Sequence, residues 1–287
     1  MPSKAAQPFS GDQGAVLVLA LWAVAVVALG AAAVIAIGQV QQRIVRNEVA
    51  ALREEMALQS GLHVVLHGLV SRPAEWPLDG RSKTVTVGAE RIVVTIADEA
   101  GKIDINMAAE DLLLGLLRPV RIGDEQKRRI AAAIQDWRDR DDERRLQGSE
   151  KADYASAGYR YEPRNRPFAN AAELQRVAGI TRELYRDLES VVTVYSQRPG
   201  VDSEVAEAEV LLRLPGMDAA AVNGILQARR TESKASGTPG HVGRTVRIST
   251  TVSERPQAMQ WDAVVRLTGT KFYQLRVMAS HRTAVLN

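Results

Sequence analysis

The chain has 287 residues, a length that fits two folding units with an accessory segment. Its composition, 46% hydrophobic and 25% charged, excludes a mainly disordered or collagen-like protein. It contains no cysteine, so a disulfide scaffold, a thiolate zinc site, an iron–sulfur cluster and a cysteine nucleophile are all excluded. The net charge of +3 is too small to indicate nucleic-acid binding by itself.

A long apolar segment near the amino terminus stands apart from the rest of the sequence. After Asp12 the next charged residue is Arg43, and residues 15–37 are apolar apart from Gly30. Because about 20 helical residues cross the hydrocarbon core of a bilayer, this run predicts a membrane-spanning helix. A secretory signal peptide has a shorter apolar region, so the run is too long for one.

The helical pattern continues beyond the apolar run to about Val70, and Arg72-Pro73 ends it. In this outer half, apolar residues recur at a spacing of three to four, which predicts a stripe that packs against a core. The stripe consists of Val45, Val49, Leu52, Met56, Leu62, Leu66 and Leu69.

Strand patterns occur at the two flanks of the remaining sequence, and a helical block lies between them. Strands are expected at residues 83–87, 91–96, 244–253, 261–268 and 273–279. Helices are expected at residues 110–117, 124–136, 171–177, 181–191, 205–212 and 219–230, before a loop at 233–243. This order predicts an α+β fold in which the long amino-terminal helix packs on a small antiparallel sheet. A large all-α domain would be inserted between two strands of that sheet.

The start of the apolar helix, from Gln13-Gly14-Ala15 to Trp22, resembles the start of type IV pilin-like proteins. The resemblance implies that a prepilin peptidase cleaves between Gly14 and Ala15. The fifth residue after this site is Leu19, where the family usually has glutamate. In the family that carboxylate is thought to neutralise the amino terminus of a neighbouring subunit, and a subunit with no neighbour above it needs none. Leu19 therefore fits the K-type minor pseudopilin, which the family view places at the fibre tip.

The middle of the chain carries further motifs in the order seen in general secretion pathway protein K: residues 98–106, 136–139, 159–168 and 173–181. The resemblance implies a single-pass protein of the bacterial inner membrane with its large domain in the periplasm. Counted alone, the arginines after the span would place that domain in the cytoplasm. The implied divisions are a leader (1–14), a transmembrane half of the stem (15–38), an outer stem with the first part of the sheet (39–106), the helical insertion (107–236) and the second part of the sheet (237–287).

The same resemblance implies a function and a set of partners. The protein would form or cap the tip of a type II secretion pseudopilus and aid initiation of fibre assembly for protein export. Its partners would be I- and J-type minor pseudopilins, prepilin peptidase, the inner-membrane assembly platform and membrane lipid.

Acidic residues gather at the end of the second helix expected in the block and just beyond it: Asp136, Asp139, Asp141, Asp142, Glu150 and Asp153. Calcium takes about six to eight hard oxygen ligands, which carboxylates from a helix end and the following loop can supply. The spacing is not that of an EF-hand, and taken alone the cluster is typical of a solvated helix end. The resemblance implies calcium in the helical domain of K-type pseudopilins, so we expect a calcium site here and no organic cofactor.

Two segments, residues 173–181 and 210–222, resemble helix-hairpin-helix turns, which present backbone amides to DNA phosphates. They support an alternative function, that of a membrane-anchored DNA-binding protein. However, the usual turn has a second glycine where this chain has Thr181 and Asp218, and a carboxylate at Asp218 would repel a phosphate. We therefore favour compact helical packing and do not expect nucleic acid as a partner.

Enzyme motifs are not found in the sequence. His63 and His67 have the spacing of a zinc pair, but Val64 stands where a metalloprotease has its glutamate, and no third ligand is evident. We expect both histidines to pack between the helix and the sheet. Neither a Gly-x-Ser-x-Gly elbow nor a phosphate-binding glycine loop occurs, so the sequence does not predict an enzyme.

Overall fold

The structure is a computed structural model, and it describes residues 12–232, 241–252, 259–268 and 275–284. The chain divides into two compact units, Met1–Met56 and Ala57–Asn287. Most of the expected leader lies outside the described residues. The same holds for most of the expected loop at 233–243 and for the first residues of the expected strand at 273–279.

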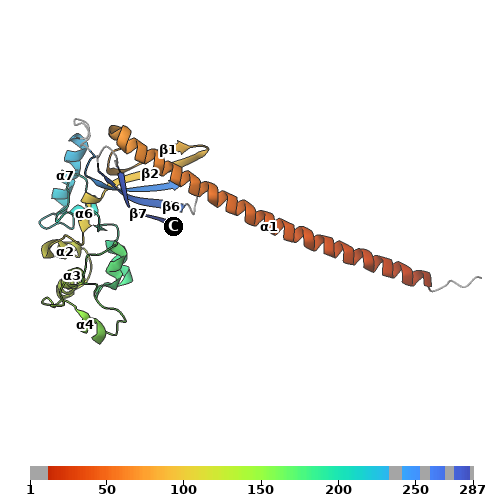
Figure 1. The fold of residues 1–287 in the computed structure, drawn as a ribbon, viewed down its shortest axis with the longest axis horizontal. Helices are drawn as coiled ribbons and strands as arrows, with labels where there is room; N and C mark the ends of the chain where they lie inside the picture. The colour runs from red at the N-terminus through yellow and green to blue at the C-terminus, as the bar shows by residue number, and fades with distance from the viewer. Residues whose placement is uncertain (1–11, 233–240, 253–258, 269–274, 285–287) are drawn as a thin grey trace, which may run out of the picture. The chain divides into compact units, whose positions relative to one another are not determined.

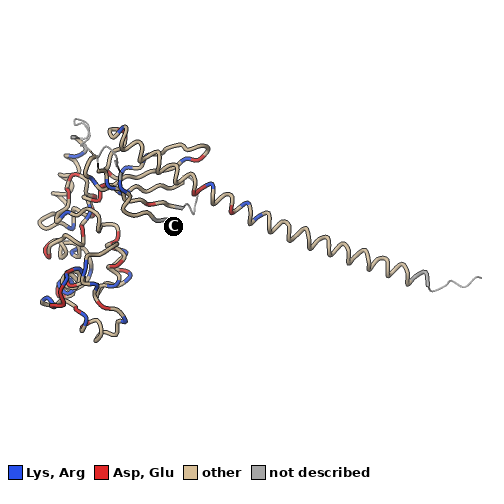
Figure 2. The backbone as a smooth tube through the Cα atoms, in the orientation of Figure 1, with Lys and Arg blue, Asp and Glu red and all other residues tan. Residues whose placement is uncertain are grey.

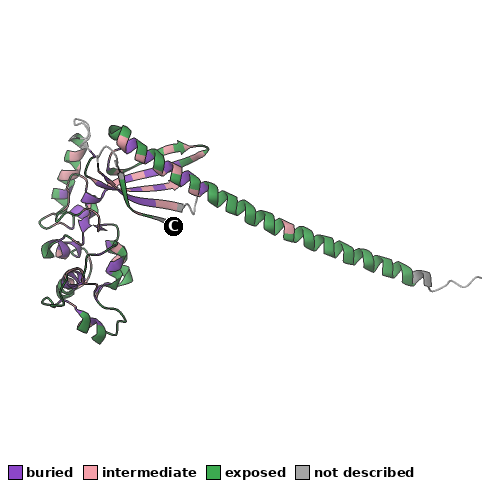
Figure 3. Ribbon diagram, viewed as in Figure 1, coloured by how far each residue is buried: buried purple, intermediate pink, exposed green. Residues whose placement is uncertain are grey.

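The first unit contains the greater part of helix α1 (Asp12–Ser71), whose bounds agree closely with the expected helix. No charged residue occurs between Asp12 and Arg43, as Figure 2 shows along this part of the ribbon. The large apolar side chains from Val16 to Ile37 are exposed (Figure 3). Among the described residues, α1 is the one helix that is long and apolar enough to cross a membrane. An exposed apolar surface of this extent fits a transmembrane anchor.

The second unit is built on a five-stranded sheet whose strands lie in the order β1-β2-β5-β6-β7. The strands are β1 (Asp79–Val87), β2 (Glu90–Asp98), β5 (Thr245–Val252), β6 (Met259–Leu267) and β7 (Leu275–Ala284). All neighbouring pairs are antiparallel, and β2 pairs with β5 in a register that places Asp98 opposite Val246. The chain between these two paired strands is therefore an insertion, as Figure 1 shows, and the predicted fold class is confirmed.

The outer part of α1 packs on this sheet, as expected. Leu58, Val65 and Leu69 are buried in one core with strand residues such as Ile92. Two glycines on the same face of the helix allow the approach: a Cβ added at Gly61 would lie 2.9 Å from Ile92 Cδ1, and one at Gly68 would lie 2.0 Å from Trp76 Nε1. A side chain at Gly61 would collide with Ile92 of β2, and one at Gly68 would collide with Trp76, which lies between α1 and β1.

The face that α1 turns to the sheet differs from the predicted stripe. Of the stripe residues, Leu69 is buried, Leu62 and Leu66 are partly buried, and Val45, Val49, Leu52 and Met56 are exposed. The prediction for His63 and His67 is wrong, because both are exposed. The predicted stripe was counted from apolar side chains, and glycine has no side chain to count. Gly61 and Gly68 nevertheless lie on the face of α1 that makes the close contacts.

The insertion consists of short elements around its own core. Its helices and strands are η2 (Glu99–Gly101), β3 (Ile103–Asp104), α2 (Glu110–Leu116), α3 (Asp124–Arg138), α4 (Lys151–Ser156), η3 (Ala171–Arg176), α5 (Arg182–Leu188), β4 (Val192–Thr193), α6 (Ala208–Leu211) and α7 (Ala219–Glu232), and a further short helix, η1 (Pro73–Glu75), follows α1. The sequence did not indicate β3 and β4, which pair in parallel, or α4.

The boundary between sheet and insertion also lies earlier than expected. Residues 99–106 were expected with the first part of the sheet, but Ile103 and Ile105 are fully buried in the core of the insertion. Two ion pairs join the base of the insertion to β5 and the residue before it: Arg244 Nη1 lies 2.6 Å from Asp98 Oδ2, and Arg247 Nε lies 2.8 Å from Glu99 Oε1. Because both carboxylates are buried, these pairs fix where the chain leaves and re-enters the sheet.

A candidate cation site in the helical insertion

The predicted acidic cluster lies around the end of α3, the following loop and the start of α4, beside a cluster of aromatic side chains. Trp137 is buried, stacks on Phe168 with ring centroids 6.1 Å apart, and lies at a tilt to Tyr154 with centroids 6.0 Å apart. The Tyr154 hydroxyl accepts a hydrogen bond from the Ala178 backbone N–H at 2.8 Å, and burial raises the pKa of this hydroxyl. These contacts hold the backbone of the acidic residues in place.

Glu150 is, with Asp136, one of the buried residues of the cluster, at 5% exposed. Its side chain forms a capping box with Asp153 at the start of α4, but neither carboxylate oxygen has a partner with the geometry of a full hydrogen bond among the described residues. Burial, together with the negative charges of Asp136 and Asp139, raises the pKa of Glu150 to about 7. A buried carboxylate without a partner is costly, and a cation beside it would remove most of that cost.

Two further oxygens in this part of the insertion are buried and lack a partner among the described residues, namely Asp139 Oδ1 and Asn165 Oδ1. Asn165 is oriented by its amide Nδ2, which donates to Asp142 Oδ1 at 2.7 Å and to the Asp141 carbonyl oxygen at 2.8 Å. Carboxylate and amide oxygens are the hard ligands that calcium takes. Asn165 was missed in the sequence because it carries no charge, although it lies within the motif at 159–168.

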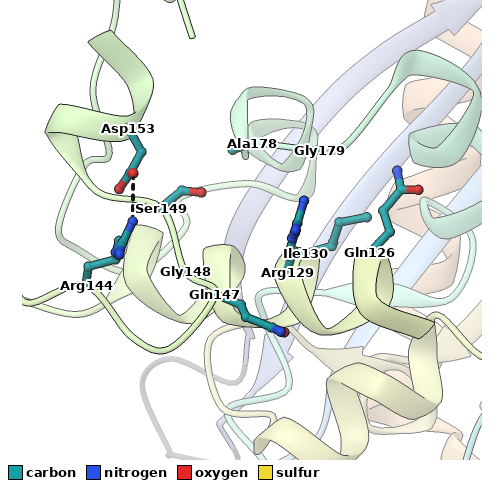
Figure 4. A pocket seen from close by; sticks show the side chains of 10 residues that line it. All are labelled: Gln126, Arg129, Ile130, Arg144, Gln147, Gly148, Ser149, Asp153, Ala178 and Gly179. Carbon is teal, nitrogen blue, oxygen red and sulfur yellow. Dashed lines mark hydrogen bonds and ion pairs between the residues drawn. The ribbon is translucent and has the colours of Figure 1, made fainter. Parts of the chain in front are cut away.

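Two of the predicted ligands have other partners instead. Asp136 is fully buried, and its Oδ2 accepts a hydrogen bond from the Ser149 N–H at 2.8 Å. Asp153 Oδ2 accepts from the Glu150 N–H at 3.0 Å at the start of α4, and its Oδ1 pairs with Arg144 at 3.0 Å (Figure 4). Both residues therefore hold the loop in shape and are not free to bind a cation in this arrangement.

Asp141 and Asp142 are both exposed. Asp141 Oδ1 accepts from the Glu143 N–H at 3.0 Å, and Asp142 Oδ1 accepts from Asn165 Nδ2 at 2.7 Å, so each carboxylate already takes part in a local contact. Of the six predicted ligands, Asp139 and Glu150 have buried oxygens without a partner among the described residues, and Asn165 adds another such oxygen.

The loop backbone passes very close to Asp136 at Gly148. A Cβ added at Gly148 would lie 1.9 Å from Asp136 Oδ2 and 2.8 Å from its Cγ. This close approach is what lets the adjacent Ser149 N–H reach the buried carboxylate. The position therefore requires glycine, and the loop depends on it.

Arg145 lies within the acidic cluster. Its Nη1 is 3.2 Å from Asp136 Oδ1, and it forms a second ion pair with Asp139. Within the described ranges, no three Asp, Glu or His side chains are close enough together to hold a metal ion in this arrangement. Carboxylate and amide oxygens are the ligand type that calcium prefers. In this structure, however, the acidic side chains do not converge on one point. The Arg145 guanidinium also lies against two of them, Asp136 and Asp139.

A shallow pocket of about 700 Å³ adjoins the cluster (Figure 4). Its two arginines are already paired, Arg129 with Glu125 at 2.5 Å and Arg144 with Asp153. The pocket therefore offers little free positive charge to an anion.

The two turns that resemble helix-hairpin-helix motifs do form, with Gly179 at φ +86° and Gly216 at φ +75°. The side chains that replace the second glycine cap the helix that follows. Thr181 Oγ1 accepts from a backbone N–H of α5 at 3.2 Å, and Asp218 Oδ1 accepts from one of α7 at 2.8 Å. These amides are the groups that a DNA phosphate would need, which favours the packing interpretation.

The fold and the site together define a class of protein. A membrane-type amino-terminal helix packed on an antiparallel sheet, with a helical domain inserted between neighbouring strands, is a pilin-like protein with an insertion. The fold resembles that of GspK in the GspK–GspI–GspJ complex of the type 2 secretion system of enterotoxigenic Escherichia coli. The TM-score is 0.55 at 14% identity, over 85% of this chain and 98% of that chain.

The sequence comparison points to the same family. Residues 93–197 match the family described as type II secretion system, protein K. No curated protein matches the sequence. Residues 93–197 thus resemble protein K of type II secretion systems, and the chain resembles GspK in its fold.

Proposed function

We propose that the chain forms or caps the tip of a type II secretion pseudopilus together with I- and J-type minor pseudopilins, and that it helps to start fibre assembly for protein export. The main support is the shared fold with GspK, which was solved in a complex with GspI and GspJ. Leu19 agrees with this role, because an apolar residue there offers no carboxylate to a neighbouring amino terminus. The role is structural and involves no catalysis.

The proposal includes the route by which the protein reaches the fibre. The single apolar helix anchors the chain in the bacterial inner membrane with the large domain in the periplasm. Prepilin peptidase removes residues 1–14, and the assembly platform then moves the chain into the pseudopilus. The support lies in α1, whose exposed apolar surface suits first lipid and then the helices of neighbouring subunits. Gly30 and Gly38 have no neighbour within 4 Å of an added Cβ, so they leave room for close helix packing.

The tip role predicts a stable complex. We expect the full chain, extracted in detergent from membranes that also contain its cognate I- and J-type pseudopilins, to be isolated together with both. An unrelated single-span protein in the same membranes serves as the control for mixing in detergent micelles. Recovery of the chain alone, while the I- and J-type proteins remain together, would contradict the proposal.

We further propose that the insertion binds calcium through Asp139, Asp142, Glu150 and Asn165. The observation that supports this is that the buried oxygens of Glu150 lack a hydrogen-bond partner in the described ranges. Bound calcium would supply positive charge to a cluster that has an excess of carboxylates. It would also join the end of α3, the start of α4 and the segment that carries Asn165, which stiffens this side of the insertion.

Calcium should therefore stabilise the protein against heat. At a calcium concentration about one hundred times Kd, the gain is about 2.7 kcal/mol, which corresponds to a rise in melting temperature of about 5–10 °C. Glu150→Gln should abolish this rise, as should Asp139→Ala. Glu143→Gln, an exposed carboxylate of the same loop, should leave it intact. An equal melting temperature of the wild-type chain in calcium and in chelator would rule out the site.

A further inference from the structure

Four apolar side chains beyond the membrane span of α1 form one exposed stripe (Figure 3). Val45, Val49, Leu52 and Met56 are 57, 41, 59 and 67% exposed. Val45 follows Ile37, the end of the apolar run, by about 12 Å at the usual helical rise, whereas the head groups on one side of a bilayer add only about 5–8 Å. Lipid therefore does not cover the stripe, and an apolar surface of this kind in water marks an interaction site.

The spacing of the stripe is that of a heptad repeat, in which the apolar positions a and d face a partner helix. Val49 and Met56 take position a, and Val45 and Leu52 take position d. A β-branched residue at a followed by leucine at d, as at Val49 and Leu52, favours a coiled coil of two parallel strands. The stripe therefore fits one further helix.

The charges that flank the stripe are complementary to those of an identical helix. Glu48 takes position g and Arg53 takes position e, five residues further on. In a parallel pair in register, g of one helix meets this e of the other, so Glu48 of each copy would lie beside Arg53 of the second copy. Both residues are exposed, and neither has an opposite charge three or four positions away in its own helix. Both charges are thus available to a partner, and symmetry gives two such pairs.

Membrane anchoring supplies the parallel orientation and the register. Copies of one sequence cross a bilayer in the same direction, which places their stripes at the same height. The heptad positions also continue into the span, with Gln42 and Ala28 at a and Gly38 and Ala31 at d. Small residues let helices approach closely in lipid, and a polar residue at a single a position fixes the register of a pair. The pairing face therefore runs without a break from the bilayer into water.

We propose that, before it joins a fibre, the protein is held in the membrane as a parallel homodimer whose stems pair along Val45, Val49, Leu52 and Met56. Pairing removes from water the apolar surface that extends beyond the bilayer. The dimer has to separate when the stem enters the fibre, because neighbouring subunits then contact the same helix. The inference goes beyond the tip role, since the dimer forms in a membrane that contains no other pseudopilin.

The chain has no cysteine, so single cysteines can report the pairing directly. Leu52→Cys places a thiol at position d, and Asn47→Cys places one at position f, on the outer side of the same helix; both positions are exposed. The full chain is made in cells that lack the other pseudopilins, and its membranes are oxidised mildly. We expect about ten times more disulfide-linked dimer from Leu52→Cys than from Asn47→Cys, because facing d positions lie within reach of a disulfide.

A charge exchange in the Leu52→Cys chain tests the register of the pair. Glu48→Arg would put two arginines side by side at both symmetric positions, and it should lower the linked fraction about fivefold. Adding Arg53→Glu restores opposite charges and should return the fraction to its original value. A change that merely disturbed the helix would not be reversed in this way.

Equal linkage of the Leu52→Cys and Asn47→Cys chains would overturn the inference, as would a loss caused by Glu48→Arg that Arg53→Glu does not reverse. A linked product with the mass of this chain plus a different protein would assign the stripe to another partner and overturn it as well. Because I- and J-type proteins are absent from these membranes, none of these results decides whether the tip role is correct.

Discussion

Trp137→Ala is expected to lower the free energy of unfolding of the second unit by about 3–5 kcal/mol, the usual cost of removing a buried aromatic side chain. Trp137 is 1% exposed and contacts the rings of Phe168, Tyr154 and Tyr161. Its loss leaves a cavity at the point where α3, α4 and the segment after α4 meet. Denaturant unfolding of the full chain in detergent, followed by tryptophan fluorescence of the remaining residues, measures the change.

Tyr159→Ala is the matched control for this prediction. Tyr159 belongs to the same aromatic cluster, with its ring 5.3 Å from Tyr154, but it is 40% exposed. Its replacement should cost less than about half as much, since less apolar surface returns to water. Equal losses for the two variants would show that Trp137 is not central to the core of the insertion.

Gly14→Leu is expected to leave the leader attached to nearly all of the protein. The peptidase implied by the resemblance cuts after a glycine, and a branched side chain at this position would obstruct the approach to the peptide bond. The unprocessed chain should stay in the membrane and fail to join the fibre. Intact mass of the chain recovered from membranes measures this directly, because retained residues 1–14 add their full mass.

Gly30→Ala is the control for the leader variant. This glycine lies in the same apolar helix, and an added Cβ there meets no atom of the described residues within 4 Å. Cleavage of the leader from the Gly30→Ala variant should be unchanged. The comparison therefore separates an effect at the cleavage position from a general effect on membrane insertion. A Gly14→Leu chain that still begins at Ala15 would show that the proposed site is wrong.

Much of the architecture could be predicted because strong local signals specify it. The apolar run and Pro73 determine the span and end of α1, and β-branched residues mark the strands on both flanks. The insertion followed from the order of these patterns, since a helical block between two groups of strands leaves few other arrangements. The pairing of β2 with β5 then confirmed it.

The rotation of α1 and the small strands of the insertion could not be predicted, for physical reasons. Gly61 and Gly68 determine the contact face of α1 through close approach, which a hydrophobic pattern does not register. Strands β3 and β4 have two residues each, and residues 99–106 join the helical core through that pairing across a long stretch of chain. Contacts of this range depend on the whole fold and leave no local signature.

The candidate site was predictable in part. The acidic residues could be recognised as a group because their charges are close in sequence, but their individual roles could not. Hydrogen bonding separates Asp136 and Asp153, which hold the loop, from Glu150, whose buried oxygens have no hydrogen-bond partner within the part of the chain that the structure describes. From the sequence, Arg145 is equally consistent with a solvated surface charge. The structure shows that it pairs with Asp136 and Asp139.

The account of this chain as a processed minor pseudopilin, and not a plain membrane anchor or a DNA receptor, is tested most directly by the amino terminus of the mature protein. We expect sequencing of the wild-type chain recovered from membranes to begin at Ala15. A mature chain that still carries residues 1–14 would contradict the account, and salt-dependent retention of that chain on DNA would then favour the receptor.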